Sequence, residues 1–207
     1  MGTCHHMDLF LVRHGVTTWN KEKRYLGQTD VSVIKSELNE LDELKNELKK
    51  IEFDGVFSSD LRRCQETLSY LEVPSHSLID KRLREINFGD WEGKTYEELQ
   101  HVPIYRQWLD QRESVRIPNG ECFESFQSRI DSFINELFKR ERPYNNVLVL
   151  SHGGVIRYVV SKLLPHVSFW SVSVEHGQAI KLSFIWQEGE WLCNSLSEVP
   201  SQEKEKL

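Results

Sequence analysis

Two histidines of this chain occur in the same local pattern, and imidazoles in that pattern could do chemistry. Residues 9–12 and residues 147–150 are short apolar runs, and they are followed by Arg13-His14-Gly15 and Ser151-His152-Gly153. Short apolar runs that stop at a glycine are typical of buried strands. Because ligands bind at the carboxyl ends of strands in open α/β sheets, we expect the two imidazoles to meet at one edge of a parallel sheet.

The chemistry that this arrangement suggests is phosphoryl transfer, with His14 as the nucleophile that takes a phosphoryl group from substrate. An imidazole is neutral for much of the time near pH 7 and has a nucleophilic nitrogen. The transferred group needs cations around its equatorial oxygens, and Arg13, Arg63 and His152 are predicted to supply them. The planar fork of arginine pairs bidentately with phosphate, and backbone N–H groups at Gly153, where a helix is expected to start, would add dipolar stabilisation.

The leaving oxygen needs a proton, and Glu85 is the candidate donor, on an irregular segment over residues 83–93. Each residue taken singly also has a simpler interpretation. A histidine at a strand end can be a hydrogen-bonded structural residue, Arg63 can be surface charge, and Glu85 can be a solvated loop residue. The catalytic interpretation is favoured because these separate roles would have to coincide at successive strand ends.

The composition excludes several other classes of function. Of the 207 residues, 39% are hydrophobic and 28% are charged, with a formal net charge of −6, which provides no general basic footprint for nucleic acid. No apolar run approaches the ~20 residues of a membrane span, and no signal peptide is evident. We therefore expect a small phosphorylated metabolite as the partner, with no nucleic acid and no membrane, and the sequence leaves the oligomeric state open.

The four cysteines are scattered, without paired spacing, which favours a reduced, cytoplasmic protein. They are Cys4, Cys64, Cys122 and Cys193.

Periodicity predicts strands that alternate with helices. The strands are expected over residues 8–13, 54–57, 76–79, 147–150, 179–187 and 190–196, and residues 15–35 are expected to be a long loop. Helices are expected over residues 38–51, from Ser59 or Asp60 through Leu71, over residues 95–111 with a break near Pro103, over residues 123–138, and after residue 152 to about Leu164. Ser36 is the expected N-cap of the first of these helices.

This alternation predicts an α/β fold with a mostly parallel sheet covered on both faces. The closing pair of strands, joined at Glu188-Gly189, predicts an antiparallel edge strand. A single domain over residues 1–207 is the simplest organisation, with loosely held ends at 1–7 and 201–207. Residues 84–121 are expected to form an excursion over the active-site edge.

Four ordered motifs resemble those of the histidine phosphatase superfamily, the phosphoglycerate-mutase-like enzymes, over almost the whole chain. The first is Arg13-His14-Gly15 with Asn20 six residues after the histidine, and the second is Ser58-Ser59-Asp60-Leu61-Arg62-Arg63. The third is Glu85, four residues before Gly89, and the fourth is Ser151-His152-Gly153-Gly154.

The resemblance implies a three-layer α/β/α fold and a phosphohistidine intermediate on His14. It implies that Arg13, Arg63 and His152 hold the phosphate, with Asn20 nearby, and that Glu85 is the general acid and base. It implies neither a metal nor a cofactor. In the second half-reaction, Glu85 would activate water for attack on the phosphohistidine.

Within the superfamily, three further segments look most like the branch of α-ribazole phosphatases and broad-specificity phosphatases. They are residues 24–30, residues 88–93 and residues 118–121. Leu26, Val16 and Cys122 depart from the family's usual residues, and Leu26 removes a polar contact, which suggests a less polar or differently shaped leaving group. The alternatives are a cofactor-dependent phosphoglycerate mutase, which the chain length disfavours, and a catalytically silent binding module on the same fold.

Overall fold

A single mixed sheet of six strands forms the centre of the computed structural model, which describes residues 5–73, 76–140 and 143–200. The strand order is β3-β2-β4-β1-β5-β6. In chain order the strands are β1 (His6–Arg13), β2 (Gly55–Ser58), β3 (Ser77–Ile79), β4 (Asn146–Ser151), β5 (Ala179–Gln187) and β6 (Glu190–Val199). The first four are parallel, whereas β5 runs antiparallel to β1 and β6 antiparallel to β5, so the predicted sheet is confirmed and its antiparallel edge is a hairpin of two strands.

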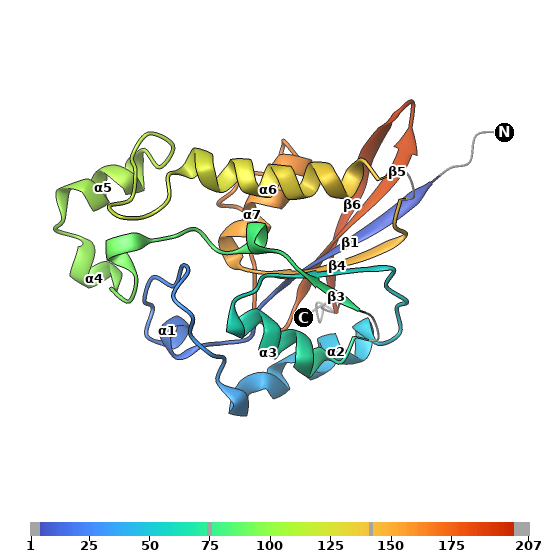
Figure 1. Ribbon diagram of the computed structural model, residues 1–207, viewed down its shortest axis with the longest axis horizontal. Helices are drawn as coiled ribbons and strands as arrows, with labels where there is room; N and C mark the ends of the chain where they lie inside the picture. The colour runs from blue at the N-terminus through green and yellow to red at the C-terminus, as the bar shows by residue number, and fades with distance from the viewer. Residues whose placement is uncertain (1–4, 74–75, 141–142, 201–207) are drawn as a thin grey trace, which may run out of the picture.

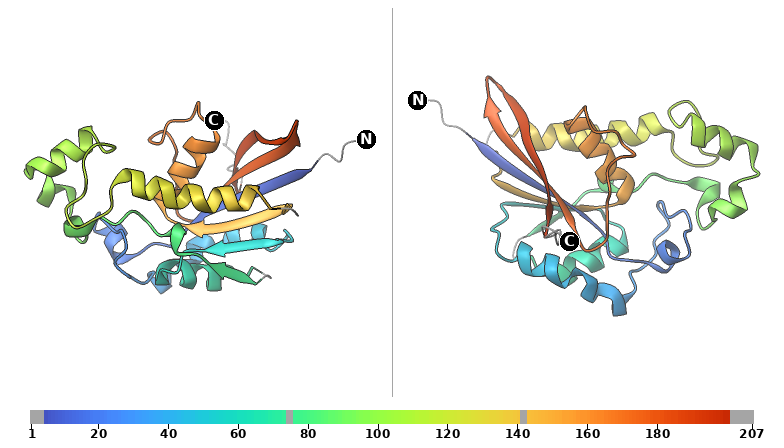
Figure 2. Two further views of the ribbon diagram at one scale, coloured as in Figure 1. Left: turned by 45° about the horizontal axis from the view of Figure 1, so that its top comes forward. Right: turned by 180° about the vertical axis from the view of Figure 1, so that it is seen from behind.

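Helices cover both faces of this sheet, which makes the three layers visible in Figure 1. The α-helices are α1 (Thr18–Lys21), α2 (Asp42–Leu48), α3 (Arg62–Leu71), α4 (Tyr96–Leu99), α5 (Pro103–Asp110), α6 (Phe123–Phe138) and α7 (Gly153–Leu163). Three short 3₁₀ helices are η1 (Lys35–Leu41), η2 (Lys81–Leu83) and η3 (Gly89–Trp91). Helices α2 and α3 lie on one face, and α6 and α7 lie on the other (Figures 1 and 2).

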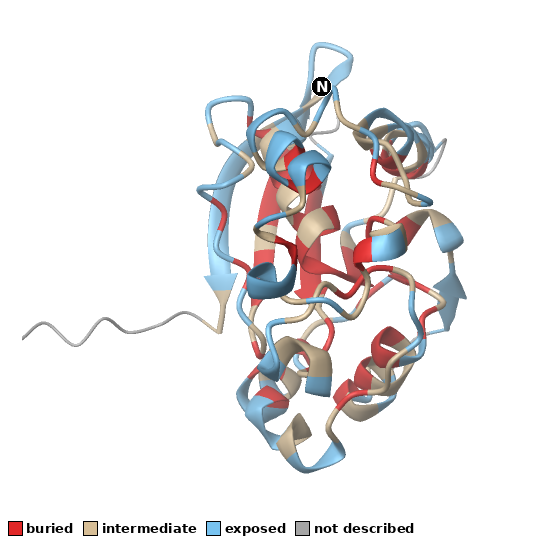
Figure 3. Ribbon diagram, turned by 90° about the vertical axis from the view of Figure 1, so that its left-hand side faces the viewer, coloured by how far each residue is buried: buried red, intermediate tan, exposed pale blue. Residues whose placement is uncertain are grey.

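The alternation of side chains along β1 explains why both faces are covered. Leu9 and Leu11 belong to the apolar cluster under α6 and α7, while Phe10 and Val12 belong to the cluster under α2 and α3. Successive side chains of a strand point to opposite faces, so a strand that is apolar at every position must be buried on both sides. In Figure 3 the central strands are accordingly coloured as buried, whereas the long outer strand is exposed.

Between η3 and α6 the chain leaves the sheet. Helices α4 and α5 project beyond one end of the sheet, on the side where α1 also lies (Figures 1 and 2). The predicted break near Pro103 is the start of α5, where proline stands in the first turn and its missing N–H has no intrahelical partner to lose. Trp91, Tyr105 and Trp108 are buried and pack on one another, so this segment has an aromatic core of its own.

Several local predictions were wrong. The expected loop over residues 15–35 contains the short helix α1, which Thr17 caps through a capping box with Asn20. Ser36 lies inside η1 and is not an N-cap, because the chain enters that helix at Ile34 without a side-chain cap. The N-cap of α3 is Leu61, not Ser59 or Asp60, and it also lacks a side-chain cap.

The expected loose N-terminal end was too long. Met7 lies in β1 and is buried, because β1 pairs with β5 from His6 onward. Residues 1–4 and 201–207, which complete that prediction, lie outside the described residues.

Candidate active site

The two histidines lie side by side where β1 and β4 end. The parallel register pairs Arg13 with Ser151, so the residues that follow, His14 and His152, leave the sheet at the same edge. Their ring centroids are 5.2 Å apart. The structure therefore brings together the two imidazoles that the sequence pattern singled out.

The ring of His14 is held with one nitrogen engaged and the other free to react. Nδ1 lies 2.8 Å from the carbonyl oxygen of Gly15, which can only accept, so Nδ1 carries the proton and Nε2 carries the lone pair. Burial, together with the positive charges of Arg63 and Arg13, holds the pKa of His14 well below its ordinary range. A neutral imidazole with a free Nε2 is the form in which histidine acts as a nucleophile.

His152 is also a neutral ring, locked by three neighbours. Arg63 Nε donates to Nδ1 at 3.3 Å, and Nε2 lies 3.0 Å from the hydroxyl oxygen of Ser59. The thiol of Cys64 lies 3.5 Å from Nε2. Burial, with the charge of Arg63 and the neighbouring His14, lowers the pKa of His152 well below its ordinary range, so in this state it offers an N–H group and not a full positive charge. A bound phosphate dianion would act in the opposite direction, because a nearby negative charge favours the protonated ring.

Arg63 lies behind His152 and is fully buried. Its terminal nitrogens donate to the carbonyl oxygens of Gly27 and Thr29 at 2.6 and 2.9 Å, in addition to the bond to His152. Arg63 thus joins the loop after α1 to the second histidine. In this structure it positions His152, and its direct contact with phosphate stays a prediction.

Arg13, at the same edge of the sheet, has a side-chain N–H donor that no described residue accepts. One terminal nitrogen donates to the carbonyl oxygen of Val174 at 2.8 Å, but Nε is buried and has no hydrogen-bond partner among the described residues. Buried polar groups in native proteins are nearly always hydrogen-bonded. The unpaired donor of Arg13 can bind an oxygen of an anionic group such as phosphate.

Glu85 is fixed at the amino end of α7. Its Oε2 accepts a hydrogen bond from the backbone N–H of Gly154 at 2.8 Å, and its Oε1 accepts one from the N–H of Ile86 at 2.9 Å. A Cβ on Gly154 would lie only 2.3 Å from Oε1, so this close approach requires glycine. Arg129 of α6 donates to the carbonyl oxygen of Glu85 at 3.0 Å and holds the segment from behind.

Asn20, which lines a cavity with Arg13 and His176, and Gly153, which directly follows His152, have different roles. The Oδ1 atom of Asn20 accepts hydrogen bonds from the N–H and hydroxyl of Thr17, so Asn20 stabilises the start of α1. Gly153 is the first residue of α7, whose N-cap is His152. Backbone N–H groups at a helix start are suited to anions.

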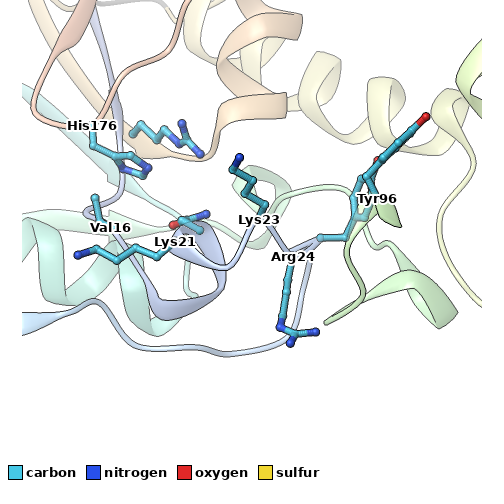
Figure 4. Close-up of a pocket in the computed structure, with 9 residues that line it drawn as sticks. Val16, Lys21, Lys23, Arg24, Tyr96 and His176 are labelled. Atoms are coloured by element: carbon cyan, nitrogen blue, oxygen red, sulfur yellow. The ribbon is translucent and has the colours of Figure 1, made fainter. Parts of the chain in front are cut away.

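A cavity of about 470 Å³ opens beside this edge and is lined mainly by polar and cationic residues, among them Arg13, Asn20, Lys23 and His176. In the view of Figure 4, Lys23 extends into the opening between His176 and Tyr96, while Arg24 points away from it. Arg24 also has acidic partners in Glu22 and Glu98.

Sequence reasoning missed three residues that hold the histidines. Ser59 was considered as a helix cap and as part of the second motif but was given no role of its own at the site, yet its hydroxyl contacts His152. Thr67 accepts a hydrogen bond from the N–H of Gly15 at 2.8 Å. The Nδ1 atom of His176 donates to the carbonyl oxygen of His14 at 2.7 Å, and burial beside Arg13 lowers its pKa to about 4. Thr67 and His176 have no local signal, because the contacts span dozens of residues or more in the chain.

The three departures from the family pattern lie in different environments. Leu26 is buried, and only Val16 of the three lines the cationic cavity. Cys122 is the N-cap residue of α6, where its thiol contacts the hydroxyl of Ser125.

The described part of the chain lacks both a metal-ligand cluster and a membrane-spanning helix. There, no group of histidine, cysteine, aspartate or glutamate residues could hold a metal ion. No helix among the described residues is both long and apolar enough to cross a bilayer.

Comparison with known proteins gives a consistent result. The model of the histidine phosphatase superfamily (branch 1) matches residues 9–198. An adenosylcobalamin/alpha-ribazole phosphatase of Salmonella typhimurium is 33% identical over 179 residues, which cover 83% of this chain and 87% of the relative. Phosphoserine phosphatase 1 of Hydrogenobacter thermophilus is 30% identical over 177 residues, covering 82% and 83%. The crystal structure of the alpha-ribazole phosphatase from Shigella flexneri superposes with a TM-score of 0.80 at 28% identity, covering 92% and 96% of the two chains.

Proposed function

The chain belongs to the histidine phosphatase superfamily, branch 1, and on that premise we propose that it hydrolyses small phosphomonoesters through a phosphohistidine on His14. The Nε2 lone pair of His14 attacks phosphorus, and the bond between phosphorus and the leaving oxygen breaks. Glu85 gives its proton to that oxygen, so the product leaves as a neutral alcohol. Arg13, Arg63, His152 and the N–H of Gly153 carry the negative charge of the transferred phosphoryl group, with Asn20 at its side.

Hydrolysis of the intermediate uses the same groups in reverse. Glu85, now a carboxylate, takes a proton from water as the water oxygen attacks phosphorus. The nitrogen–phosphorus bond breaks, the electron pair returns to Nε2 of His14, and inorganic phosphate leaves. Glu85 gives one proton to the leaving oxygen and regains one from water, so we propose that catalysis needs no metal and no cofactor.

The observation that carries this proposal is the state of the His14 ring. Its Nδ1 proton is committed to Gly15 and its burial keeps it neutral, which leaves Nε2 as the nucleophile. The unsatisfied Nε of Arg13 beside it supports an anionic group as the substrate's reacting part.

The substrate class that the relatives favour is a small metabolite phosphate. The matched relatives are named as phosphatases of alpha-ribazole and of phosphoserine, and we propose α-ribazole phosphate as the first candidate. A phosphoglycerate mutase, the alternative left open by the sequence, would return the phosphoryl group to an organic acceptor before water reaches it.

The test is a panel of phosphomonoesters assayed for released phosphate. It contains α-ribazole phosphate, phosphoserine, 3-phosphoglycerate and an aryl phosphate, with kcat/KM as the measure. We expect phosphate release from at least one ester at a rate that exceeds the uncatalysed reaction by the ~10⁶-fold or more typical of enzymes. Isomerisation of 3-phosphoglycerate that bisphosphoglycerate stimulates, with little phosphate release, would favour the mutase instead.

We also propose a cytoplasmic location and a single catalytic domain. The location is supported by Cys64, Cys122 and Cys193, which are free thiols. The single domain is supported by β1 and β4, which draw their two histidines from opposite ends of the chain into one site.

A further inference from the structure

A second cavity, of about 220 Å³, adjoins the active site on the side of Glu85. Glu85 and Gly154 form part of its lining, so the proposed proton donor faces this space. The other walls are mostly aromatic rings from three separate parts of the chain. These rings belong to Tyr25, Phe88, Trp108, Phe123, Phe126, Phe169 and Trp170.

Arg112 lies among these rings in an unusual state. Its guanidinium carbon lies 4.6 Å from the ring centre of Trp108 and 3.5 Å from that of Trp170. Its Nε is buried and has no hydrogen-bond partner among the described residues. A guanidinium presents its N–H donors in one plane, whereas its faces stack on aromatic rings. Stacking on the indoles therefore leaves Nε, one of the donors in that plane, without an acceptor.

A buried donor without an acceptor is costly and rare in native proteins. The cost disappears if a ligand brings an acceptor atom to the guanidinium when it enters the cavity. The aromatic walls favour a flat ring as the rest of that ligand, because rings stack and pack edge to face with one another. The cavity is smaller than the ~300–1,000 Å³ of typical ligand pockets, so it has room for one ring system.

The position of Glu85 indicates which part of a substrate enters this aromatic cavity. The general acid must reach the leaving oxygen, so the group attached to that oxygen lies on the side of Glu85. The cationic cavity lies on another side of the histidines and is lined by lysines such as Lys23, which is exposed. The aromatic cavity is thus the better match for the leaving group.

We propose that the aromatic cavity is the leaving-group site, that it selects esters whose alcohol carries one flat ring, and that Arg112 binds a hydrogen-bond acceptor on that ring. The proposal rests on the proposed function, because it takes Glu85 as the proton donor. It makes Arg112 a specificity-determining residue that takes no part in bond breaking.

The experiment compares three esters with the same phosphate-bearing methylene group. They are pyridin-3-ylmethyl phosphate, benzyl phosphate and cyclohexylmethyl phosphate, which differ in the acceptor atom and in the flatness of the ring. In the wild-type protein we expect kcat/KM to fall in that order. The step from pyridyl to benzyl is about tenfold or more, as expected for a hydrogen bond to a charged group.

The Arg112→Leu variant should remove the advantage of the pyridyl ester over the benzyl ester. Trp170→Leu should reduce the advantage of both flat rings over the cyclohexyl ring, and Trp170 is exposed enough for the fold to tolerate the change. The matched control is Arg106→Leu, at an exposed position of the neighbouring helix α5, which should keep the wild-type order.

Equal kcat/KM for the three esters in the wild-type protein, or an unchanged order in Arg112→Leu, would overturn the proposal while leaving the phosphatase activity standing. A separate binding measurement tests the cavity even if the protein has no phosphatase activity. Binding of 3-pyridinemethanol, followed by tryptophan fluorescence, should weaken about tenfold in Arg112→Leu. If neither these esters nor any ester of the phosphomonoester panel is hydrolysed and this weakening is still seen, the proposed function fails and the ring-binding cavity stands. If binding is the same in both proteins, the cavity assignment fails.

Discussion

Arg63 is fully buried and Arg112 is partly buried, and the two arginines differ in how their side-chain nitrogens are hydrogen-bonded. Arg63 has a protein acceptor at each of its three nitrogens, and the groups it holds are His152 and the loop after α1. Arg112 stacks on two indole rings and leaves its Nε without an acceptor. The first arrangement is complete without a ligand, whereas the second is completed by one.

This difference separates two regions of the site. The floor, defined as His14, Arg63, Glu85 and His152, is buried and preorganised by hydrogen bonds to the protein. Preorganised donors cost no rearrangement during the reaction, so the floor suits the phosphoryl group that every substrate shares. The wall, defined as Arg112 and the rings around it, suits the part in which substrates differ. Changes in the floor should therefore lower turnover of all substrates, and changes in the wall should reorder them.

The most severe test of the floor is His14→Ala. We expect loss of all measurable turnover and of acid-labile phosphoenzyme, because no other described group offers a free imidazole nitrogen at this position. The measurement is phosphate release together with trapping of phosphoenzyme after acid-free quenching. The matched control is the exposed His166→Ala, which should behave as wild type. Full activity in His14→Ala would contradict the role of His14 as the nucleophile.

The next largest effect is expected for Glu85→Gln. The amide keeps the size and the contact to Gly154 but cannot exchange a proton, so kcat should fall by ~10²–10⁴-fold for all substrates. Phosphate binding, measured by product inhibition, should change little. Glu124→Gln, at an exposed position in the first turn of α6, is the control. A loss confined to KM would argue that Glu85 only binds substrate.

Gly154→Ala tests whether the position of Glu85 matters as much as its chemistry. The new Cβ would meet Oε1 at 2.3 Å, so the carboxyl group must move. A misplacement of about 1 Å typically costs ~10²-fold in rate, and we expect kcat to fall by about that factor while the melting temperature changes little. Ser161→Ala, later on the same helix, serves as the control. Wild-type kcat in Gly154→Ala would show that the carboxyl group is not fixed by this contact.

Acid should destabilise the protein through its buried histidines. Burial lowers the pKa of His14 and His152, and that of His176 to about 4, so the folded state stays neutral where the unfolded state takes up protons. Stability is thus unaffected by these groups above the ordinary pKa of ~6.5 and falls as the pH drops below it, by up to ~1.4 kcal/mol per pH unit for each histidine.

Urea denaturation between pH 7 and pH 5 measures this dependence. His176→Phe should remove one proton from the difference between the two states and flatten the slope. Identical slopes in the two proteins would show that His176 takes up its proton equally in the folded and unfolded chain.

The smallest effect is expected for metal removal. Treatment with EDTA should leave kcat/KM unchanged for every ester, because the floor's own side chains supply the charge and the protons. The assay is the same phosphate release before and after dialysis, with added Mg²⁺ or Zn²⁺ as the second arm. A loss of activity that a divalent ion restores would contradict a mechanism carried by protein groups alone.

The sequence predicted those parts of the molecule whose signals are local. An apolar run of four followed by Arg-His-Gly or Ser-His-Gly spans seven residues of the chain, and it located the carboxyl ends of β1 and β4 to within one residue. The mostly parallel sheet, covered by helices on both faces, followed from the alternation of strands and helices, whereas the strand order came only from the structure. The chemistry of the floor could be proposed because histidine and arginine types are visible without coordinates.

The sequence did not predict contacts between distant segments. Arg112 and Trp170 are 58 positions apart, and neither has a pattern around it that indicates stacking. His176 binds the backbone of His14, which lies 162 positions earlier in the chain. The contact of Ser59 with His152 was not predicted, because Ser59 was interpreted as a helix cap. Leu26 is buried and lines neither the cationic nor the aromatic cavity, and its effect on a substrate contact stays a prediction.

Arg129 has a consequence for engineering. From α6 its guanidinium binds the carbonyl oxygens of Arg84 and Glu85 and the carboxylate of Glu121, and these residues are the two ends of the excursion. Because Arg129 holds both ends of this segment together, the segment between them can be exchanged for another without moving its ends. Lengthening a closed loop adds only about 0.6 kcal/mol of closure cost per doubling, so segments of other lengths could be grafted between the same two anchor points without disturbing the floor.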